Sequence, residues 1–290
     1  MPIEITSPEK IIWPANKVTK HDYMAYLIQI SPYMLPFLNN RLLTVIRYPH
    51  GVDNSFFYQK NCPDYAPDYV ETVESEGINY IVCNSVYTLC WLGNQLAIEF
   101  HVPFQAIGEA WPLEIVFDLD PPDTDHFFLA VKAAREIHTL LHEFRIKSYP
   151  KLSGNKGIQI HIPVIPRPLS YEDTRIFTSF IAQYLTEKFP DLFTTERMKK
   201  NRGGRLYIDY VQHAEGKTII APYSARGSNP YGQVAAPLYW NEVNDSLSPR
   251  HFTLDTVLKR VKKAKCPFHD YFTSENLNLY RFIRTLKANR

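Results

Sequence analysis

The chain has 290 residues, of which 45% are hydrophobic and 14% aromatic, so it can bury one large core or two closely packed lobes. It contains no uncharged apolar run of about 18 residues, and its first ten residues lack the basic-then-apolar layout of a signal peptide. We therefore expect a cytoplasmic protein with no membrane partner. The four cysteines (Cys62, Cys83, Cys90 and Cys266) form no C-x-x-C pair, which excludes a zinc ribbon and predicts reduced, buried thiols.

The net charge of +2 conceals two strongly basic segments. Residues 197–226 hold seven Lys or Arg against two acids, and residues 255–290 hold nine against three. Such local charge suits a phosphate-rich partner, although solvated helix faces would give the same pattern.

The predicted elements of the first half begin with a helix over residues 22–38, broken by Pro32 and Pro36. A strand over 42–47 follows and ends at Tyr48 and Pro49. After the turn at 50–54, we expect a helix over 85–96 and a short strand over 97–101.

In the second half, residues 113–120 (LEIVFDLD) predict a strand that two prolines end, and an apolar stripe predicts a helix over 125–144. Residues 158–165 alternate as a strand with Ile158, Ile160 and Ile162 on one face. A helix over 171–189 and strands over 205–211 and 218–221 complete the set. Helices and strands interleave without βαβ regularity and without an internal repeat, so we expect an α+β fold with a mixed or largely antiparallel sheet.

Asp118 and Asp120 close the strand at 113–120, and the two-residue period of a strand points both carboxylates to one face. Two adjacent acids repel each other unless a cation lies between them, and Mg²⁺ or Mn²⁺ takes carboxylate oxygens. Two such ions about 3.5 to 4 Å apart can activate an attacking hydroxyl and hold a leaving pyrophosphate. The bare alternative is two acids that cap a strand end.

Asp209 is a lone acid inside the apolar strand at 205–211 and is the best candidate for a third carboxylate. Burying an unpaired carboxylate costs several kcal/mol, so a cation should face it. That cation can equally be Arg202 or Arg205 in a structural salt bridge.

The loop SGNKG at 153–157 combines two glycines with Ser153 and Lys156 ahead of an alternating strand. Glycines let backbone amides approach phosphate oxygens while the hydroxyl donates and the lysine supplies charge. An ordinary surface turn is the alternative reading. A similar GKT at 216–218 is no Walker A loop, because Val211 stands where that motif requires glycine.

Two further pairs admit a functional and a structural reading. His138 and His142 lie one helical turn apart, but Thr139 replaces the Glu of a zinc protease, so we interpret them as a helix flank. Phe56 and Phe57 could stack on unpaired bases, each worth about 1 to 3 kcal/mol. As a bare pattern, adjacent aromatics more often bury at least one ring.

These segments together resemble the primase-polymerase module of bacterial and archaeal ligase D, a branch of the archaeo-eukaryotic primase superfamily. The likeness runs from about residue 10 to about residue 270. It rests on IWP at 12–14, VTK at 18–20, RYPHG at 47–51, FFYQKN at 56–61, IEFH at 98–101, FDLDP at 117–121, SGNKG at 153–157, GRLYIDY at 204–210, and GKT at 216–218 with APYSAR at 221–226.

The resemblance implies a primase-like fold in one domain over residues 1–290, with helices flanking the catalytic sheet. An N-terminal lobe (1–110) would carry the DNA-end contacts, and a catalytic lobe (111–290) the chemistry. It implies that Asp118, Asp120 and Asp209 bind two Mn²⁺ or Mg²⁺ ions. The nucleoside triphosphate would be held by Ser153, Lys156, Arg226, His101, Arg47, Gln159 and Lys217.

By the same resemblance, Lys10 and Lys20 would grip a 5′ phosphate, and Phe56, Phe57 and Lys60 would contact DNA at that end. Implied partners are DNA ends with 5′-phosphate gaps or overhangs, nucleoside triphosphates, Ku and a DNA ligase. The implied location is cytoplasmic and nucleoid-associated, and a preference for ribonucleotides comes with the family.

One position departs from the family loop S-G-x-K-G-x-H, because Gln159 stands where the histidine is expected. His161 lies two residues on, on the same strand face, and is a candidate substitute. The departure bears on how strongly the triphosphate binds.

The leading hypothesis is therefore metal-dependent gap filling and end extension during non-homologous end joining. The alternative from another class is a DNA-end bridging module that binds 5′ phosphates with weak or no catalysis. A third is a primase that starts chains without a primer.

Overall fold

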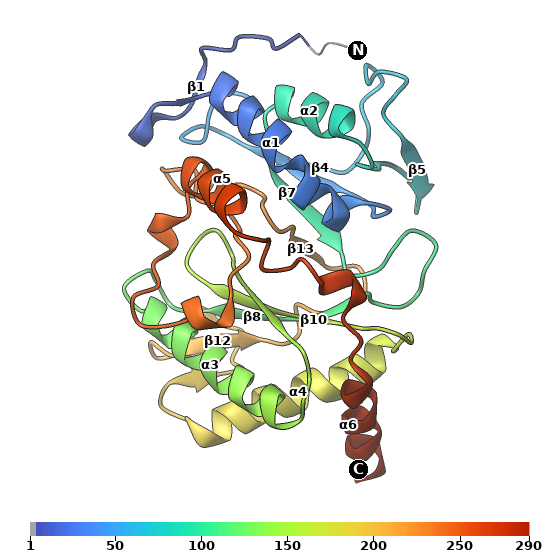
Figure 1. Ribbon diagram of the computed structural model, residues 1–290, viewed down its shortest axis with the longest axis vertical. Helices are drawn as coiled ribbons and strands as arrows, with labels where there is room; N and C mark the ends of the chain where they lie inside the picture. The colour runs from blue at the N-terminus through green and yellow to red at the C-terminus, as the bar shows by residue number, and fades with distance from the viewer. Residues whose placement is uncertain (1–3, 290) are drawn as a thin grey trace. The chain divides into compact units, whose positions relative to one another are not determined.

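The computed structural model describes residues 4–289 and contains two compact units (Figure 1). The first unit comprises the chain up to Pro103, Thr218–Ala236 and Pro249–Cys266. The second comprises Phe104–Lys217, Pro237–Ser248 and the chain from Pro267. Each unit thus assembles from three separate segments, whereas the lobes expected at 1–110 and 111–290 are continuous. That the whole chain acts as one domain stays a prediction.

The first unit is built on a four-stranded antiparallel sheet in the order β13-β7-β3-β4. Its strands are β3 (Thr44–Arg47), β4 (Phe57–Gln59), β7 (Ala97–Pro103) and β13 (Thr218–Ile220). Two small hairpins accompany it, β1 (Ile11–Trp13) with β2 (Val18–Thr19) and β5 (Thr72–Ser75) with β6 (Ile78–Ile81). Helix α1 (Lys20–Leu38) packs against α2 (Val86–Asn94) and α5 (Leu254–Lys263).

The expectation that prolines break the first helix is wrong, since α1 continues to Leu38 through Pro32 and Pro36. Both prolines are exposed and lie one turn apart, while Met34 on the other side is fully buried. Pro32 has no N–H for the carbonyl of Ile28, but the Ser31 hydroxyl donates to that oxygen over 2.8 Å. Burial of the inner face and this replacement bond allow the helix to continue.

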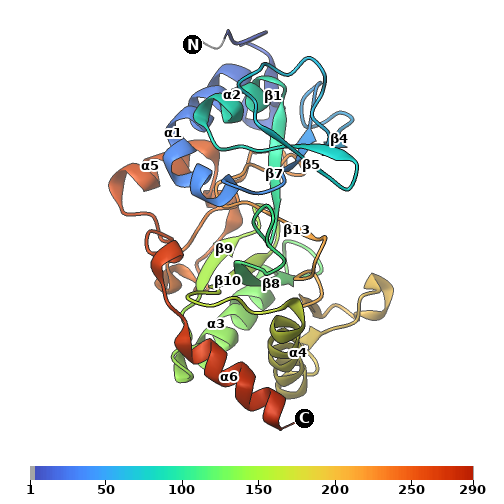
Figure 2. The ribbon, with the colours of Figure 1, turned by 90° about the vertical axis from the view of Figure 1, so that its right-hand side faces the viewer.

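The second unit carries a five-stranded mixed sheet in the order β11-β12-β8-β10-β9. Its strands are β8 (Glu114–Asp120), β9 (Tyr149–Leu152), β10 (Ile158–Pro163), β11 (Phe193–Thr194) and β12 (Leu206–Asp209). β11 and β12 run parallel, and the other neighbours run antiparallel. The expected α+β class with a mixed sheet flanked by helices is therefore confirmed (Figure 2).

The two faces of this sheet have opposite character. The expected apolar face of β10 is confirmed, because Ile158, Ile160 and Ile162 are fully buried. Helices α3 (Phe127–Glu143) and α4 (Tyr171–Lys188) contact the sheet on this side, where Phe117 of β8 meets Phe177 of α4. α6 (Leu277–Ala288) packs in turn on α4. The opposite face is left to polar side chains.

Short one-turn helices punctuate the connections, at Pro14–Asn16, Lys199–Asn201, Trp240–Glu242, Pro249–His251 and Tyr271–Thr273. Across residues 4–289, no helix has the length and apolarity that a membrane crossing requires. The four cysteines are free, and Cys62, Cys83 and Cys90 are buried as expected, whereas Cys266 is half-buried.

Candidate active site

Strand register in the second unit brings the predicted carboxylates together on the polar face of the sheet. Asp209 of β12 lies directly opposite Asp118 of β8, and Gln159 of β10 lies opposite Asp118 on its other side. Directly opposed residues place their Cβ atoms about 4.5 to 5.5 Å apart. Asp120 is the next residue on the same face, opposite Tyr207. Three acids from two strands therefore occupy neighbouring positions, as the residue pattern predicts.

Each carboxylate has its own set of protein donors. Asp118 accepts from the Gln159 amide over 3.3 Å. Asp120 lies 3.2 Å from the Lys156 ammonium and 3.3 Å from the Arg202 guanidinium. Asp209 accepts from the Tyr207 hydroxyl over 3.1 Å and from the backbone N–H of Gln212 over 2.9 Å.

Arg202 and Arg205, the alternative salt-bridge partners expected for Asp209, contact other groups. Arg202 pairs with Asp120, and Arg205 donates to the backbone carbonyl of Arg202 over 2.8 Å. The two hydrogen-bond donors of Asp209 are neutral groups. Burial raises the pKa of its carboxyl and outweighs these two hydrogen bonds and the charge of Arg197, with a further small contribution from the Asp120 charge. An ionised Asp209 is thus undercompensated by protein groups.

The donor set fits a hard divalent ion, because such ions take carboxylate oxygens and would relieve the repulsion among the acids. Within residues 4–289, however, no three His, Cys, Asp or Glu side chains already converge as a metal cage. Lys156 and Arg202 supply the positive charge at Asp120 instead. Metal binding by the three acids stays a prediction.

The SGNKG loop is held against the end of β8. The Ser153 hydroxyl accepts from the backbone N–H of Gly157 over 3.0 Å, and Lys156 donates to the carbonyls of Pro121 and Pro122 over 2.6 and 2.8 Å. A Cβ on Gly157 would lie 2.5 Å from the Leu119 carbonyl oxygen, so only glycine permits this close approach. The loop thereby brings Lys156 beside Asp120, with Ser153 at the start of the same turn.

Gln159 is fixed by a lysine that the sequence did not single out. Lys151 of β9 is fully buried and donates to the Gln159 amide oxygen over 2.6 Å, which turns the amide nitrogen toward Asp118. His161 is also fully buried and lies 3.0 Å from Glu114, to which Tyr271 donates as well. His161 therefore takes part in a polar cluster of its own, and we do not assign it to phosphate.

Two of the predicted nucleotide residues of the first unit, His101 and Arg226, contact the buried carboxylate of Glu99. His101 lies 3.1 Å and Arg226 2.7 Å from one oxygen of this carboxylate. Tyr48 and the backbone N–H of Gly227 donate to the other oxygen over 3.1 and 3.0 Å. A lone acid inside the apolar strand at 97–103 is the signal that could have identified Glu99, as it did for Asp209.

Two other predicted nucleotide residues have different surroundings. The Arg47 guanidinium donates to the backbone and side-chain oxygens of Gln95 over 2.8 and 3.0 Å, to Gln59 over 2.9 Å and to Tyr65 over 3.1 Å. These hydrogen bonds hold the Arg47 side chain against its neighbours within the first unit. Lys217 is exposed at the end of a segment of the second unit.

The residues expected at a DNA end belong to the first unit. Lys20 is buried, and its ammonium donates to the Thr6 carbonyl and hydroxyl over 2.6 and 2.8 Å, while its backbone N–H donates to the Lys10 carbonyl. Burial, with the Lys10 charge, lowers the pKa of Lys20 to about 8. The Lys10 ammonium donates to the Pro49 carbonyl.

The aromatic pair lies on the surface. Phe56 and Phe57 are 53% and 44% exposed, so the expectation that at least one ring is buried is wrong. Tyr58 beside them is 67% exposed, and Lys60 is exposed too. Short β4 is the last strand of its sheet, and two of its three residues are exposed. His138 and His142 lie on α3 as expected, and the His138 ring stacks on Trp240 with their centroids 3.9 Å apart.

Comparison with known proteins identifies what this geometry is similar to. A family model described as the LigD primase-polymerase domain matches residues 19–268. The chain is 58% identical over 270 residues to the bifunctional non-homologous end joining protein LigD of Bacillus subtilis, covering 93% of this chain and 44% of that protein. It is 32% identical over 266 residues to the multifunctional LigD protein of Mycolicibacterium smegmatis, covering 89% and 34%.

Among solved structures, the polymerase domain from Mycobacterium tuberculosis ligase D in complex with DNA is similar, with a TM-score of 0.86 and 29% identity. The match covers 94% of this chain and 99% of that one. The chain spans less than half the length of the two curated relatives above.

Proposed function

Because the chain belongs to the LigD primase-polymerase domain family, we propose that it is a metal-dependent, DNA-directed nucleotidyltransferase that extends DNA ends and fills gaps during non-homologous end joining. The observation that carries the proposal is the register that sets Asp209 opposite Asp118 with Asp120 next on the same face. A preference for ribonucleotides belongs to the proposal through family resemblance alone.

Asp118, Asp120 and Asp209 would hold two Mn²⁺ or Mg²⁺ ions, which when bound lower the pKa of an attacking hydroxyl and neutralise a departing pyrophosphate. Gln159, oriented by Lys151, fixes the Asp118 carboxylate on one side. Arg202 and Lys156 hold Asp120 between them, which limits its freedom before any ligand binds.

The main contacts of the triphosphate are proposed to come from the SGNKG loop at 153–157, which lies next to Asp120. Lys156 brings a positive charge within 3.2 Å of Asp120, so phosphate oxygens near the carboxylates would meet a cation. Ser153 shapes the loop and would present its hydroxyl, and Gln159 would offer a neutral amide. Lys217 of the same unit is proposed as a further phosphate contact, and Arg47, His101 and Arg226 of the first unit as further nucleotide contacts.

DNA ends are the proposed macromolecular substrate. A structural neighbour of this chain is a ligase D polymerase domain in complex with DNA. The neighbouring positive charges of Lys10 and Lys20 would attract a 5′ phosphate, although the Lys20 ammonium is buried and bonded to Thr6 and would have to act from that position. Exposed Phe56 and Phe57 offer rings to unpaired bases, with Lys60 nearby in sequence. Ku and a DNA ligase are proposed partners by resemblance, and a nucleoid-associated location follows from the same proposal.

A second candidate is a DNA-end bridging module with weak or no catalysis. It is favoured by the paired lysines, the exposed aromatic rings, and Gln159 in place of a family histidine. In this alternative the carboxylates would serve only the fold of the second unit.

Nucleotide incorporation on a gapped duplex with a 5′ phosphate, in the presence of Mn²⁺, separates the two. We expect extension by one or more nucleotides; tight phosphate-dependent binding without extension would select the bridging module. Extension on a single-stranded template without a primer would instead select a primase.

Metal binding has a readout that does not depend on turnover. Any ion that binds the folded state alone stabilises it, by about 2.7 kcal/mol at one hundred times its dissociation constant. We expect Mn²⁺ to raise the melting temperature of the wild type and to raise it far less for Asp209→Asn. An equal shift in both proteins would remove Asp209 from the metal site.

A further inference from the structure

We propose that Glu99 is a positioning residue that aims Arg226 and His101 at the nucleotide through one carboxylate oxygen. The proposal rests on the proposed function, because Arg226 and His101 are nucleotide contacts only within it. Glu99 itself would touch neither nucleotide nor metal.

The two oxygens of Glu99 serve different groups. Oε2 accepts from Arg226 Nη1 over 2.7 Å and lies 3.1 Å from His101 Nε2. Oε1 accepts from the Tyr48 hydroxyl over 3.1 Å and from the Gly227 backbone N–H over 3.0 Å. One oxygen thus ties Glu99 to the framework, and the other holds the side chains with a proposed function.

The Glu99 carboxylate is ionised although it is buried. Glu99 is 1% exposed. Burial opposes its ionisation, but the hydrogen bond from His101 and the charge of Arg226 outweigh burial and lower the pKa of Glu99 to about 2. Charge-assisted bonds of this kind are short and directional, so they restrict the partners to one geometry.

Packing at Gly227 makes the framework side rigid. A Cβ on Gly227 would lie 2.1 Å from the Tyr48 ring, so the ring sits directly against this backbone. The Arg226 backbone is held as well, since its N–H donates to the Gln233 carbonyl over 2.9 Å and its carbonyl accepts from the Trp13 indole over 3.3 Å. With the backbone held and Nη1 of the planar guanidinium bonded to Glu99, the other N–H groups of Arg226 are restricted to a narrow range of directions.

This arrangement predicts separate effects for the two oxygens. Glu99→Gln replaces one acceptor oxygen by an NH₂ group, which cannot accept from the donors around it. Tyr48→Phe removes a donor to Oε1 and leaves the Arg226 and His101 contacts at Oε2 in place. The second variant is therefore the matched control for loss of packing or stability.

Steady-state incorporation on a gapped duplex tests the inference. We expect Glu99→Gln to raise KM for the nucleotide about 10-fold to 100-fold with a much smaller change in kcat. Tyr48→Phe should lower the melting temperature and change KM by less than about twofold. If the two variants raise KM equally, Glu99 has only a structural role and the inference is wrong.

Arg226→Gln distinguishes failure of the inference from failure of the underlying assignment. If it raises KM while Glu99→Gln does not, Arg226 binds the nucleotide without help from Glu99. If neither raises KM, the nucleotide assignment itself fails. In the double variant the increase should be no larger than for Arg226→Gln alone, because both changes remove the same contact. If Glu99→Gln does not fold, Glu99→Asp, which keeps the charge but shortens the reach, takes its place with the same expected rise.

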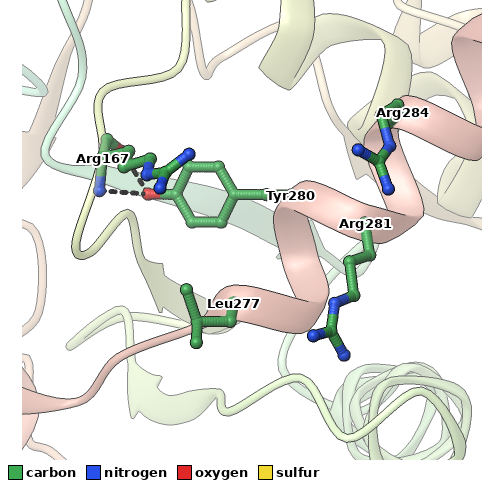
Figure 3. A pocket seen from close by; sticks show the side chains of 5 residues that line it. All are labelled: Arg167, Leu277, Tyr280, Arg281 and Arg284. Carbon is green, nitrogen blue, oxygen red and sulfur yellow. Dashed lines mark hydrogen bonds between the residues drawn. The ribbon is translucent and has the colours of Figure 1, made fainter.

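A different observation carries a second inference, on the surface of the second unit. A pocket of about 420 Å³ is lined by three arginines (Arg167, Arg281 and Arg284) with Tyr280 and Leu277. Figure 3 shows these five side chains. We infer that this pocket binds successive phosphates of a nucleic-acid strand. Because α6 lies beyond α4 on the helical side of the sheet, such a contact would be separate from the carboxylate face.

Charge and geometry favour this ligand. Within residues 4–289, no carboxylate forms an ion pair with any of the three arginines, and α6 contains no acidic residue. The Tyr280 hydroxyl accepts from the Arg167 N–H over 2.9 Å and donates to its carbonyl, which fixes the loop beside the helix. Arg281 and Arg284 point in different directions in Figure 3, which suits repeated charges along a backbone better than one small anion.

The salt dependence of binding to single-stranded DNA tests this second inference. Replacing all three arginines by glutamine should reduce the slope of log Kd against log salt by about 2.1, the value for three lost phosphate contacts at about 0.7 each on single-stranded DNA. The control removes equal charge from α5 through Lys259→Gln, Lys262→Gln and Lys263→Gln. An unchanged slope, or an equal reduction in the control, would overturn the inference. Competition by a glutamate-rich peptide as strong as that by an oligonucleotide would show an acidic-peptide site instead.

Discussion

The two units treat an acid inside an apolar strand in opposite ways. Glu99 of the first unit collects four donors, including a guanidinium, and its pKa falls to about 2. Asp209 of the second unit accepts hydrogen bonds from two neutral groups, and burial raises its pKa. The first carboxylate is satisfied by the protein and so can position other groups. The second retains a charge that the protein compensates poorly, which is what a cation-binding acid requires.

The largest effect should come from removing a charge in the opposed pair of acids. We expect Asp118→Asn to reduce nucleotide incorporation about 10³-fold, about 4 kcal/mol in activation free energy, because a transition-state charge loses its counter-ions. Binding to gapped DNA should change by less than about twofold. Asp123→Asn is the control, since Asp123 is an exposed acid just after β8. More than about a tenth of wild-type activity in Asp118→Asn would contradict the site.

The next largest effect should be on the free energy of unfolding, which we expect Glu99 and Asp209 to influence in different ways. Glu99→Gln leaves Arg226 without its buried partner and should lower the free energy of unfolding by about 3 to 5 kcal/mol. Asp209→Asn removes an undercompensated charge and should leave that free energy unchanged or raise it by less than about 1 kcal/mol in the absence of metal. Urea denaturation of both variants measures the difference. Losses of equal size would erase the contrast between the units.

The pH dependence of stability should show the same difference between Glu99 and Asp209, with a smaller effect. The folded pKa of Glu99, about 2, lies below its ordinary 4.5, so its stabilisation is full above about pH 4.5 and is lost as the pH falls toward 2. The raised pKa of Asp209 has the opposite sign, because its ionised form costs stability and that cost disappears as the pH falls below the ordinary 3.8.

Urea unfolding from about pH 6 to about pH 3 checks these signs. Compared with the wild type, Glu99→Gln should lose less stability on acidification, and Asp209→Asn should lose more. A shift in the same direction for both variants would contradict the opposite pKa changes.

The smallest effect is expected at Gln159. A neutral histidine can accept from Lys151 with one ring nitrogen and donate to Asp118 with the other, as the amide does. We expect Gln159→His to keep or raise nucleotide affinity, by less than about tenfold, in an equilibrium binding measurement. Gln159→Leu is the control, because it removes both bonds at similar volume. A large loss of affinity in the histidine variant would show that Gln159 does more than orient Asp118.

Much of the second unit could be predicted because its signals are local. Alternation fixes the apolar face of β10, and the same period places Asp118 and Asp120 on one face of β8. The breaks expected at Pro32 and Pro36 were wrong for a tertiary reason: burial of Met34 and its neighbours and the Ser31 bond sustain the helix. The exposure of both Phe56 and Phe57 was also missed, because alternation cannot show that β4 lies at a sheet edge.

The sequence alone determined six of the strands (β3, β7, β8, β10, β12 and β13), the class of fold, the family resemblance and the acids available to bind a cation, because these depend on residue type and short-range period. It did not predict β9 and β11, which complete the sheet of the second unit. Only the tertiary structure decided that β12 pairs with β8 so that Asp209 faces Asp118, that Arg202 belongs to Asp120, and that Glu99 joins Tyr48 to Arg226 across more than one hundred residues. Strand order, register and long-range partners are set by packing of the whole core, and no local pattern encodes that choice.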